Sequence, residues 1–504
     1  MKAKITSDKK FIQITEYTDL EIEQLQFSFK KRIDAWRWSP LVKSGRWDGY
    51  IKFVDRYNRI PVGLWHELNV FCNKFEFELS IEGFSQIVNL DFDRTEFENW
   101  VNDFFKDHPK ITPYDYQVES AINILKYKRS SSEIATSAGK TLIIFMVFAY
   151  LMHKGDLKKF MIIVPSTNLI LQTIDDFSEY DPHGKLEYKL QPLHGGTTKK
   201  KENSDIIIGT YQSLVKRPAD WFDEVDVICV DECHHTHAQS IKTIITKCSN
   251  INYTFGVSGT LKAPDGSAGA FTIQAYLGPI VNDISAKFLI NNNYATGIFV
   301  KVVILDYLDD ELKQKLQELR ERKNEFEGTK LLDLEKRVVH DNRRRFVYVC
   351  DFISKVSKNS LVFFSDVKNG YGRRIYDYLR NNTNKHIFYV DGGTPPKLRE
   401  EYFARMEIGS DCIIVCTFGT LGTGISINNI HNIFFVESYK SDRIIRQSIG
   451  RGMRLRKNKN KVMIIDFVDD FKYVDDNYLY KHGKDRMRTY REQGFPYKKY
   501  KVKF

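Results

Sequence analysis

A short loop between an extended segment and a long apolar run most constrains how this chain folds. The loop, residues 135–141, reads Ala-Thr-Ser-Ala-Gly-Lys-Thr. Gly139 permits a tight turn whose N–H groups point at phosphate oxygens, Lys140 brings a positive charge to them, and the Thr141 hydroxyl can bind Mg²⁺. A helix that begins here adds its partial positive charge. The loop predicts a nucleotide-phosphate site, although Ile134 stands where the usual motif has its first glycine.

Two acidic residues follow a second apolar segment further along the chain. Residues 225–230 are apolar apart from Asp226, and Asp231 and Glu232 come next. A carboxylate at the end of a parallel strand, beside a phosphate loop, is where a Mg²⁺ ligand is needed. Asp231 is therefore the predicted metal ligand together with Thr141, and Glu232 is predicted to polarise the attacking water. A surface acidic pair is the alternative, but the two motifs together are hard to obtain by chance.

Short apolar segments alternate with helical patterns from about residue 110 onward. The strand candidates are Phe160–Val164, Ile206–Gly209, Val225–Val230, Tyr253–Ser258, Leu361–Phe364, Ile387–Val390, Cys412–Cys416, Ile433–Val436 and Val462–Ile465. Glycine-containing and hydroxyl-rich motifs stand at the ends of several of them. This alternation, with chemistry at strand ends, is typical of a parallel, doubly wound sheet. The predicted fold class is therefore α/β.

Further motifs accompany the phosphate loop in a fixed order. They are Tyr114 and Gln117, Pro165-Ser166-Thr167, Gly209-Thr210-Tyr211-Gln212, Ser258-Gly259-Thr260, Leu361–Asp366, Thr417–Ile425 and Gln447–Arg454. Together with the loop and Asp231-Glu232-Cys233-His234, the series resembles the superfamily 2 helicases of the DExH branch over roughly residues 110–460. The resemblance implies two RecA-like parallel-sheet domains in tandem, which hydrolyse ATP with Mg²⁺ and act on nucleic acid.

The resemblance also assigns roles at the nucleotide. It implies that Gln117 contacts the adenine, with Tyr114 beside it, and that the loop residues Thr136, Ser137, Ala138, Gly139, Lys140 and Thr141 bind phosphate. Gly424, in a glycine-rich segment, is predicted to bring backbone close to the phosphates. Ser426 stands where many relatives carry an aspartate, which puts a ribose contact there in doubt. For Gln117, an exposed amide at a helix start is the alternative.

The second half of the chain is expected to complete the catalytic set. Gln447, Arg451 and Arg454 join Lys140, Asp231 and Glu232 in the predicted set. Arg451 and Arg454 lie one turn apart on one face of a predicted helix. Two planar cations that face the γ-phosphate across a cleft would stabilise charge in the transition state. Paired surface arginines are the alternative.

Hydroxyl groups at strand ends are the candidate contacts to the nucleic acid in the motor domains. The predicted residues are Pro165, Ser166, Thr167, Thr210, Ser365, Thr417 and Thr420. Hydroxyls and helix N-termini at such positions suit contacts to the sugar-phosphate backbone. Taken singly, each hydroxyl is also explained as a helix N-cap.

An aromatic and basic stretch stands out before the motor motifs. From Lys30 to Arg59 there are nine basic and three acidic residues, with tryptophans among them. Rings between cations suit stacking and backbone contacts to nucleic acid, so Arg37, Lys43 and Arg46 are predicted contacts. Alternatively, the tryptophans are the core of a small domain with a solvated basic face. Residues 36–72 also resemble the N-terminal domain of phage UvsW-type recombination helicases.

We predict four parts: a small α+β accessory domain 1–105, motor domains 106–305 and 306–466, and a basic helical tail 467–504. Residues 102–113, with two prolines, are the predicted linker. The segment 306–345 is predicted to form charged helices, with Arg343-Arg344-Arg345 at a solvated helix end. Between Lys481 and Phe504 there are nine basic and two acidic residues, in a tail that resembles that of the UvsW-type helicases. The tail is expected to be disordered or docked on the second motor domain.

The composition narrows the partners and the compartment. The net charge of +11 indicates a polyanionic partner. No run of about 18 uncharged apolar residues is present, so no membrane span is expected. The N-terminus does not resemble a signal peptide, and an odd count of seven cysteines fits reduced thiols in a cytoplasm, that of the host if the chain is phage-encoded. We expect no zinc site, and we expect the protein to be a monomer.

The sequence is compatible with three functions. The UvsW resemblance implies an ATP-dependent DNA helicase or translocase that acts on branched or forked DNA by branch migration and fork remodelling, in recombination, repair and replication. An RNA helicase of the same superfamily is the second. The third is a non-catalytic binding module or the motor subunit of a restriction-type complex. The intact Lys140, Asp231, Glu232 and Arg454 argue against an inactive ATPase.

Overall fold

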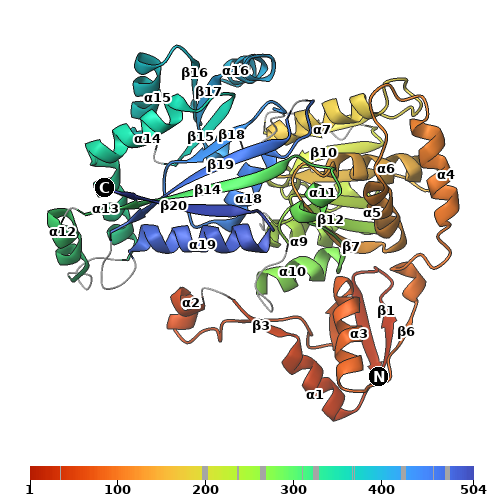
Figure 1. The fold of residues 1–504 in the computed structure, drawn as a ribbon. Helices are drawn as coiled ribbons and strands as arrows, with labels where there is room; N and C mark the ends of the chain where they lie inside the picture. Colours follow the sequence, from red (N-terminus) through yellow and green to blue (C-terminus); the bar gives the residue numbers. More distant parts are fainter. Residues whose placement is uncertain are drawn as a thin grey trace. The chain divides into compact units, whose positions relative to one another are not determined.

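The chain forms two compact units, Met1–Ile284 and Ser285–Phe504, which are described separately (Figure 1). The computed structural model describes residues 1–33, 36–195, 203–234, 238–261, 268–308, 310–321, 328–365, 367, 369–421, 427–457, 459–471 and 477–504. Gly424 and Ser426 lie outside these ranges. The second unit begins at Ser285, earlier than the motor boundary at 305/306 that the sequence suggested.

The first unit opens with a small mixed sheet in the order β5-β2-β1-β6. Its elements are β1 (Lys2–Ile5), β2 (Phe11–Glu16), β5 (Arg59–Pro61) and β6 (Ser80–Glu82), with the helices α1 (Asp19–Ser28) and α3 (Trp65–Lys74). Helix α1 starts where Thr18 accepts a hydrogen bond from the backbone of Glu21 and the Glu21 carboxylate accepts one in return, a capping box. The predicted α+β N-terminal domain is thus present.

A two-stranded antiparallel ribbon extends the basic stretch. It pairs β3 (Lys30–Arg32) with β4 (Tyr50–Lys52), and between them lie the 3₁₀ turn Trp36–Trp38 and helix α2 (Pro40–Lys43). None of the tryptophans of this stretch belongs to the buried core of the domain, and Trp38 is 77% exposed. The interpretation of these tryptophans as a core is therefore wrong.

The first seven-stranded sheet is parallel throughout, in the order β13-β7-β12-β11-β8-β10-β9. Its strands are β7 (Arg129–Ile134), β8 (Phe160–Val164), β9 (Leu190–Leu193), β10 (Ile206–Thr210), β11 (Val227–Asp231), β12 (Tyr253–Ser258) and β13 (Ile280–Ile284). The packed helices include α5 (Asp115–Lys126), α6 (Lys140–His153), α7 (Thr167–Tyr180), α8 (Tyr211–Leu214), α9 (Ala238–Lys247) and α10 (Ala268–Leu277). Helix α6 is apolar on all sides because it is buried along almost its whole length.

Helix α4 (Arg94–Phe105) runs into the segment that the sequence suggested as a linker. Asp93 caps its start by accepting a hydrogen bond from the backbone of Glu96. Phe104 and Phe105 are buried, and both rings lie near Phe145 of α6. A linker that begins at residue 102 is therefore wrong, because the last turn of α4 is anchored on the first motor domain.

The second unit contains another parallel seven-stranded sheet, in the order β16-β17-β15-β18-β19-β14-β20. Its strands are β14 (Gly297–Asp306), β15 (Ser360–Phe364), β16 (His386–Val390), β17 (Cys412–Thr417), β18 (Asn432–Phe435), β19 (Lys461–Asp470) and β20 (Tyr497–Lys503). Strand β14, which the sequence assigned to the first motor domain, pairs with β19 and β20 along its length. Two RecA-like sheets in tandem are confirmed.

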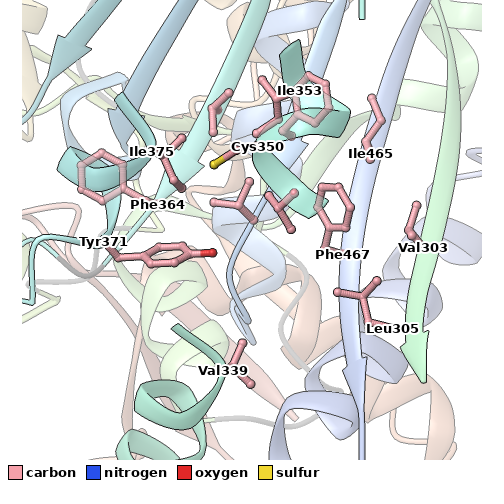
Figure 2. Close-up of a cluster of buried hydrophobic side chains, with 14 of the residues drawn as sticks. Val303, Leu305, Val339, Cys350, Ile353, Phe364, Tyr371, Ile375, Ile465 and Phe467 are labelled. Carbon is pink, nitrogen blue, oxygen red and sulfur yellow. The ribbon is translucent and has the colours of Figure 1, made fainter. Parts of the chain in front are cut away.

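Helices complete the second unit. They are α11 (Ala286–Asn291), α12 (Asp310–Glu321), α13 (Gly328–Asp341), α14 (Arg343–Lys355), α15 (Tyr371–Asn382), α16 (Pro396–Ile408), α17 (Phe418–Leu421), α18 (Asp442–Gly452) and α19 (Tyr478–Glu492). Figure 2 shows Cys350 and Ile353 of α14 and Ile375 of α15 packed with Ile465 and Phe467 of β19. Within the described ranges, no helix is long and apolar enough to cross a membrane.

The C-terminal segment is part of this unit and not a disordered tail. Helix α19 packs on β19, and β20 forms the edge strand beside β14. The final Phe504 is buried in the same core. The strand reads Tyr-Lys-Lys-Tyr-Lys-Val-Lys, and its lysines are exposed while its backbone pairs with β14. Lysines on an exposed edge strand also discourage pairing with another chain.

Candidate active site

The predicted phosphate loop connects the end of β7 to the start of α6. Ser137 and Gly139 have left-handed backbone conformations, with φ of 72° and 78°. A methyl group on Gly139 would lie 2.3 Å from Nε2 of Gln117, so both its backbone conformation and the available space require glycine. The loop therefore has the tight shape that was inferred from the sequence.

Helix α5 holds this loop from the side. The Tyr116 hydroxyl and Nε2 of Gln117 both donate to the Ala138 carbonyl, at 3.0 and 2.9 Å. Oε1 of Gln117 accepts from the Tyr114 backbone N–H at 2.9 Å. Gln117 is 5% exposed, which contradicts the alternative of an exposed helix-start amide. Tyr114 is 40% exposed, and its ring stacks on that of Tyr116.

A network of charged and polar groups joins the loop to the end of β11. Nζ of Lys140 lies 2.6 Å from Oε1 of Glu232. The other Glu232 oxygen, Oε2, is 3.1 Å from Nδ1 of His234, which in turn contacts the Ser258 hydroxyl. Glu232 sits in a left-handed backbone conformation, with φ of 50°, immediately after the strand. Non-glycine residues in that region concentrate at functional sites.

The two carboxylates of this network differ in electrostatic environment. Burial raises the pKa of Asp231, and the adjacent Glu232 charge raises it further. Burial alone would also raise the pKa of Glu232, but the Lys140 ammonium and the His234 side chain outweigh it and hold that pKa well below its usual range. Glu232 is therefore the carboxylate that stays ionised most firmly.

The donor atoms near the loop fit a magnesium ion bound with a nucleotide. Thr141, the second residue of α6, offers a hydroxyl, and Asp231 offers a carboxylate whose Oδ1 accepts the Glu232 N–H at 2.9 Å. No cluster of three or more His, Cys, Asp or Glu side chains that could hold a metal occurs in the described part of the chain. Mg²⁺ commonly takes one or two protein oxygens and completes its shell with phosphate and water.

Helix α18 carries Gln447 and Arg451, two of the three catalytic residues predicted in the second unit. Its buried face presents Ile445, Ile449 and Met453 at the helix C-terminus to the core. Gln447 and Arg451 are half-buried. The helix ends at Gly452, so Arg454 lies beyond it and not one turn along the same helix, as the sequence suggested. The Arg454 carbonyl accepts hydrogen bonds from Thr296 and Lys459.

Residues 436–439, which form the turn between β18 and α18, are all hydrogen-bonded to other parts of the second unit. Each of the four residues after β18 makes a hydrogen bond of 2.9 or 3.0 Å to another part of the unit. The pairs are Val436 with Arg345, Glu437 with Ser365, Ser438 with His482 and Tyr439 with Arg486. Ser441 then caps the helix by accepting from the Ile444 N–H. The direction of α18 is therefore fixed by α14, α19 and the end of β15.

Two buried arginines, Arg345 and Arg486, supply two of these hydrogen bonds and form what we call the buried frame before α18. Arg345 pairs with Asp469 at 2.7 Å, and Arg486 pairs with Asp466 at 2.8 Å. All four side chains are at most 2% exposed, and both aspartates stand on β19. The expectation of a solvated helix end at residues 343–345 is wrong for Arg345. Arg345 and Arg486 are the largest fully buried side chains among the described residues.

The hydroxyls proposed for nucleic-acid contact fall into two groups. Ser166 and Thr210 are the N-cap residues of α7 and α8. The Ser166 hydroxyl is buried without a hydrogen bond in the described structure, while Thr210 bonds to Ser213 at 3.0 Å. Thr167 is exposed, and Pro165 is half-buried beside it. In the second unit, Ser365 bonds to Glu437, and Thr417 bonds to Thr420 at 3.0 Å.

Comparison with known proteins decides the family. A family model described as the N-terminal domain of the DNA helicase UvsW matches residues 4–82. Models of the type III restriction enzyme res subunit and of the conserved helicase C-terminal domain match residues 110–263 and 344–456. The ATP-dependent DNA helicase uvsW of Enterobacteria phage T4 is 30% identical over 495 residues, 94% of each chain. This chain belongs to the UvsW family of DNA helicases.

The structure agrees with that assignment. The crystal structure of T4 UvsW matches over 100% of both chains, with a TM-score of 0.50 and 28% identity. A DNA-bound type ISP restriction-modification enzyme, LlaBIII, gives a TM-score of 0.57 at 16% identity, over 86% of this chain and 34% of that one. The similarity to LlaBIII shows the fold alone. As a UvsW-family helicase, the protein is a nucleic-acid-dependent ATPase that acts on DNA.

Several residues of the UvsW-type site were not anticipated from the sequence. Tyr116 buttresses the loop, and Arg345 and Arg486 frame the turn before α18. A signal existed for the last two. Strand β19 reads Lys-Val-Met-Ile-Ile-Asp-Phe-Val-Asp-Asp, and the acids at 466 and 469 interrupt an otherwise apolar run. Acids at such buried positions require cationic partners elsewhere in the chain.

Proposed function

We propose that this protein is a motor that couples ATP hydrolysis to movement on branched DNA, as in branch migration and fork remodelling. The observation that supports it most is the pairing of Lys140 with Glu232 beside Asp231, at the junction of the phosphate loop and the end of β11. These residues bring a cation for phosphates, a carboxylate for a metal and an ionised base to one place. This combination is what phosphoryl transfer requires.

In the first unit, the loop N–H groups and Lys140 would bind the phosphates of ATP. Lys140 would then exchange its contact with Glu232 for one with a phosphate oxygen, and Glu232 would orient the attacking water. The His234 side chain, which also lowers the pKa of Glu232, would stay beside it and keep the carboxylate ionised for that role. Thr141 and Asp231 would hold Mg²⁺, which supplies positive charge to the phosphates. Gln117 and Tyr114 would contact the adenine, on the same helix start that secures Ala138.

The second unit would complete the site. Gln447, Arg451 and Arg454 would face the γ-phosphate and stabilise the charge that develops as the bond breaks. Closure of the units on ATP and their opening after hydrolysis would change the spacing of two DNA-binding surfaces. A difference between nucleotide states of that kind supplies a directional step.

The DNA contacts would come from both motor domains and from the basic stretch near the N-terminus. Ser166, Thr167 and Thr210 stand at strand ends of the first sheet, and the helix starts beside them offer further donors. Arg37 and Lys43 lie on either side of Trp38 in the ribbon region. The T4 relative is named a DNA helicase, which supports DNA as the substrate.

Titration of ATP hydrolysis tests this proposal. We expect forked DNA and four-way junctions to stimulate hydrolysis at lower concentrations than blunt duplex or structured RNA of the same length. Lys140→Ala should bind the same DNA and show no stimulation. Equal stimulation by plain duplex would remove branched DNA from the proposal, and stronger stimulation by RNA would favour the RNA-helicase alternative.

A further inference from the structure

The N-terminal domain has an antiparallel ribbon of β3 and β4 between α1 and α2 (Figure 1). A row of alternating rings and cations runs along it, from the end of α1 to the 3₁₀ turn before α2. Each cation of the row lies over at least one neighbouring ring, at 4.0 to 5.5 Å from the ring centre. In order, this ring–cation row comprises Phe27, Lys30, Tyr50, Arg32, Trp36 and Arg37. Lys43 forms a further pair with Trp38 at 5.2 Å.

The cations of the row have no carboxylate partners among the described residues. No ion pair to Lys30, Arg32 or Arg37 is formed there, whereas the nearby Arg59 pairs with Asp55 at 2.8 Å. Within the described ranges, the printed contacts of these cations are to ring faces. Such a surface attracts a polyanion.

Two rings of this surface are largely exposed. Phe27 is 70% exposed and Trp38 is 77% exposed. Phe27 and Lys30 also line an open groove of about 880 Å³, together with Lys52, Arg56 and Phe75 and with the acidic Glu23 and Asp55. Exposed aromatic faces next to uncompensated cations are an expensive arrangement for a surface without a ligand.

We infer that this surface binds single-stranded DNA through its unpaired bases. A duplex presents phosphates to the cations, but its base faces are covered by stacking, so it would leave the rings of Phe27 and Trp38 unused. An unpaired strand offers phosphates and open base faces together, and each base that stacks on a ring gains affinity without regard to sequence. The inference rests on the proposed function and deepens it, because a branch point is where unpaired bases occur.

The N-terminal domain is positioned to act with the first motor domain. Phe29 at the end of α1 and Phe53 after β4 both pack on Phe271 of α10, with ring centres 5.6 and 4.8 Å apart. Lys31 of β3 lies over the same ring at 4.7 Å. The base of the ribbon is therefore attached to the domain that contains the phosphate loop. A strand bound along the ribbon would be held next to the motor.

Three probes separate base stacking from phosphate attraction in the full-length protein without ATP. They are an oligothymidine strand, an abasic strand of the same length and a blunt duplex. We expect Phe27→Ala and Trp38→Ala each to weaken oligothymidine binding by about tenfold. Binding of the abasic strand and the duplex should change less than about twofold, and the salt dependence of binding should be unchanged, because no phosphate contact is lost.

Leu20→Ala is the matched control, because Leu20 is 60% exposed on the same helix as Phe27 and has no ring. It should leave all three affinities unchanged. Equal losses on the abasic strand, or no loss on oligothymidine, would overturn the inference. DNA-stimulated ATP hydrolysis by the same variants at saturating forked DNA should stay near that of the unmodified protein. That result would leave the proposed motor standing even if the stacking surface failed.

Discussion

Replacement of Arg486 by methionine tests whether the buried Arg486–Asp466 pair stabilises the second unit and sets the direction of α18. The Arg486 guanidinium donates from Nε and Nη2 to Asp466, at 2.9 and 2.8 Å, and from Nη1 to the Tyr439 carbonyl at 2.9 Å. Arg486 is 1% exposed and Asp466 is fully buried. Methionine fills much of the same volume but leaves the Asp466 charge without its cation.

The cost follows from that geometry. Removal of one partner of a buried ion pair destabilises a protein by about 3–5 kcal/mol. For a domain the size of the second unit, each kcal/mol lowers the melting temperature by about 2–4 °C, so we expect a fall of roughly 6–20 °C. The turnover of ATP below the melting temperature should also fall with little change in KM, because the Tyr439 turn sets the direction of α18 and of Arg451.

Arg488→Met supplies the control on the same helix. The Arg488 side chain is 63% exposed, and it pairs with Asp485 and Glu492 at 3.2 and 3.9 Å. Exposed pairs of this kind contribute at most about 1 kcal/mol. Calorimetry measures both variants, and tryptophan fluorescence reports on the first unit alone, because all six tryptophans precede residue 285. A melting curve for Arg486→Met that matches that of Arg488→Met would refute the reasoning.

Three further changes give independent predictions. Gly139→Ala should weaken the binding of a fluorescent ADP analogue, because the new methyl group would collide with the Gln117 side chain. An unchanged affinity for the analogue in a titration would contradict this prediction. Asp231→Asn should raise the Mg²⁺ concentration for half-maximal hydrolysis at least about tenfold, and an unshifted Mg²⁺ curve would argue against the ligand role. Burial, together with the charge of Arg486, lowers the pKa of His482 from its usual 6.5 to about 4. Between these two pH values the unfolded chain is protonated at His482 and the folded protein is not, so the free energy of unfolding should fall as the pH drops from about 6.5 towards 4. His482→Gln should flatten that decline in thermal melts, and an equally steep decline would contradict it.

The sequence was most informative where a strand or helix is apolar throughout. Strand β8 has the residue range that was expected, because it is an apolar run between turn residues. Strand β12 also has the expected range, although Thr254 and Gly256 interrupt its apolar residues. Strand β7 gave a weaker signal, since Arg-Ser-Ser-Ser-Glu-Ile is mostly polar yet entirely buried. Its Ser130 hydroxyl is buried without a partner among the described residues. The other two serines have hydrogen-bond partners: Ser131 donates to the Gly278 carbonyl, and Ser132 accepts from the Asn282 side chain. Such partners lie far along the chain and cannot be inferred from a local pattern.

The boundary between the motor domains differs from the predicted one, and of the two alternatives for the tail the docked one is confirmed. Parallel strands pair with segments distant in sequence, so nothing local to β14 indicates that its neighbours are β19 and β20. The basic composition of β20 reflects an exposed edge strand and not disorder. Arg454 was placed on a helix by spacing alone, whereas α18 ends at Gly452, which packs closely on Val462 and Ile433.

We propose that Lys140, Asp231 and Glu232 of the first unit bind the phosphates and metal of one ATP and position the attacking water. Arg451 and Arg454 of the second unit would help to hydrolyse the same ATP. Single-turnover ATP hydrolysis by Arg451→Ala on saturating forked DNA tests this central claim most directly, with ATP binding measured in parallel. An arginine that stabilises the transition state contributes about 10³-fold or more to the rate. We expect Arg451→Ala to lose that much of the rate while ATP binding is retained. Hydrolysis within a few-fold of the unmodified protein would mean that Arg451 does not act on the nucleotide.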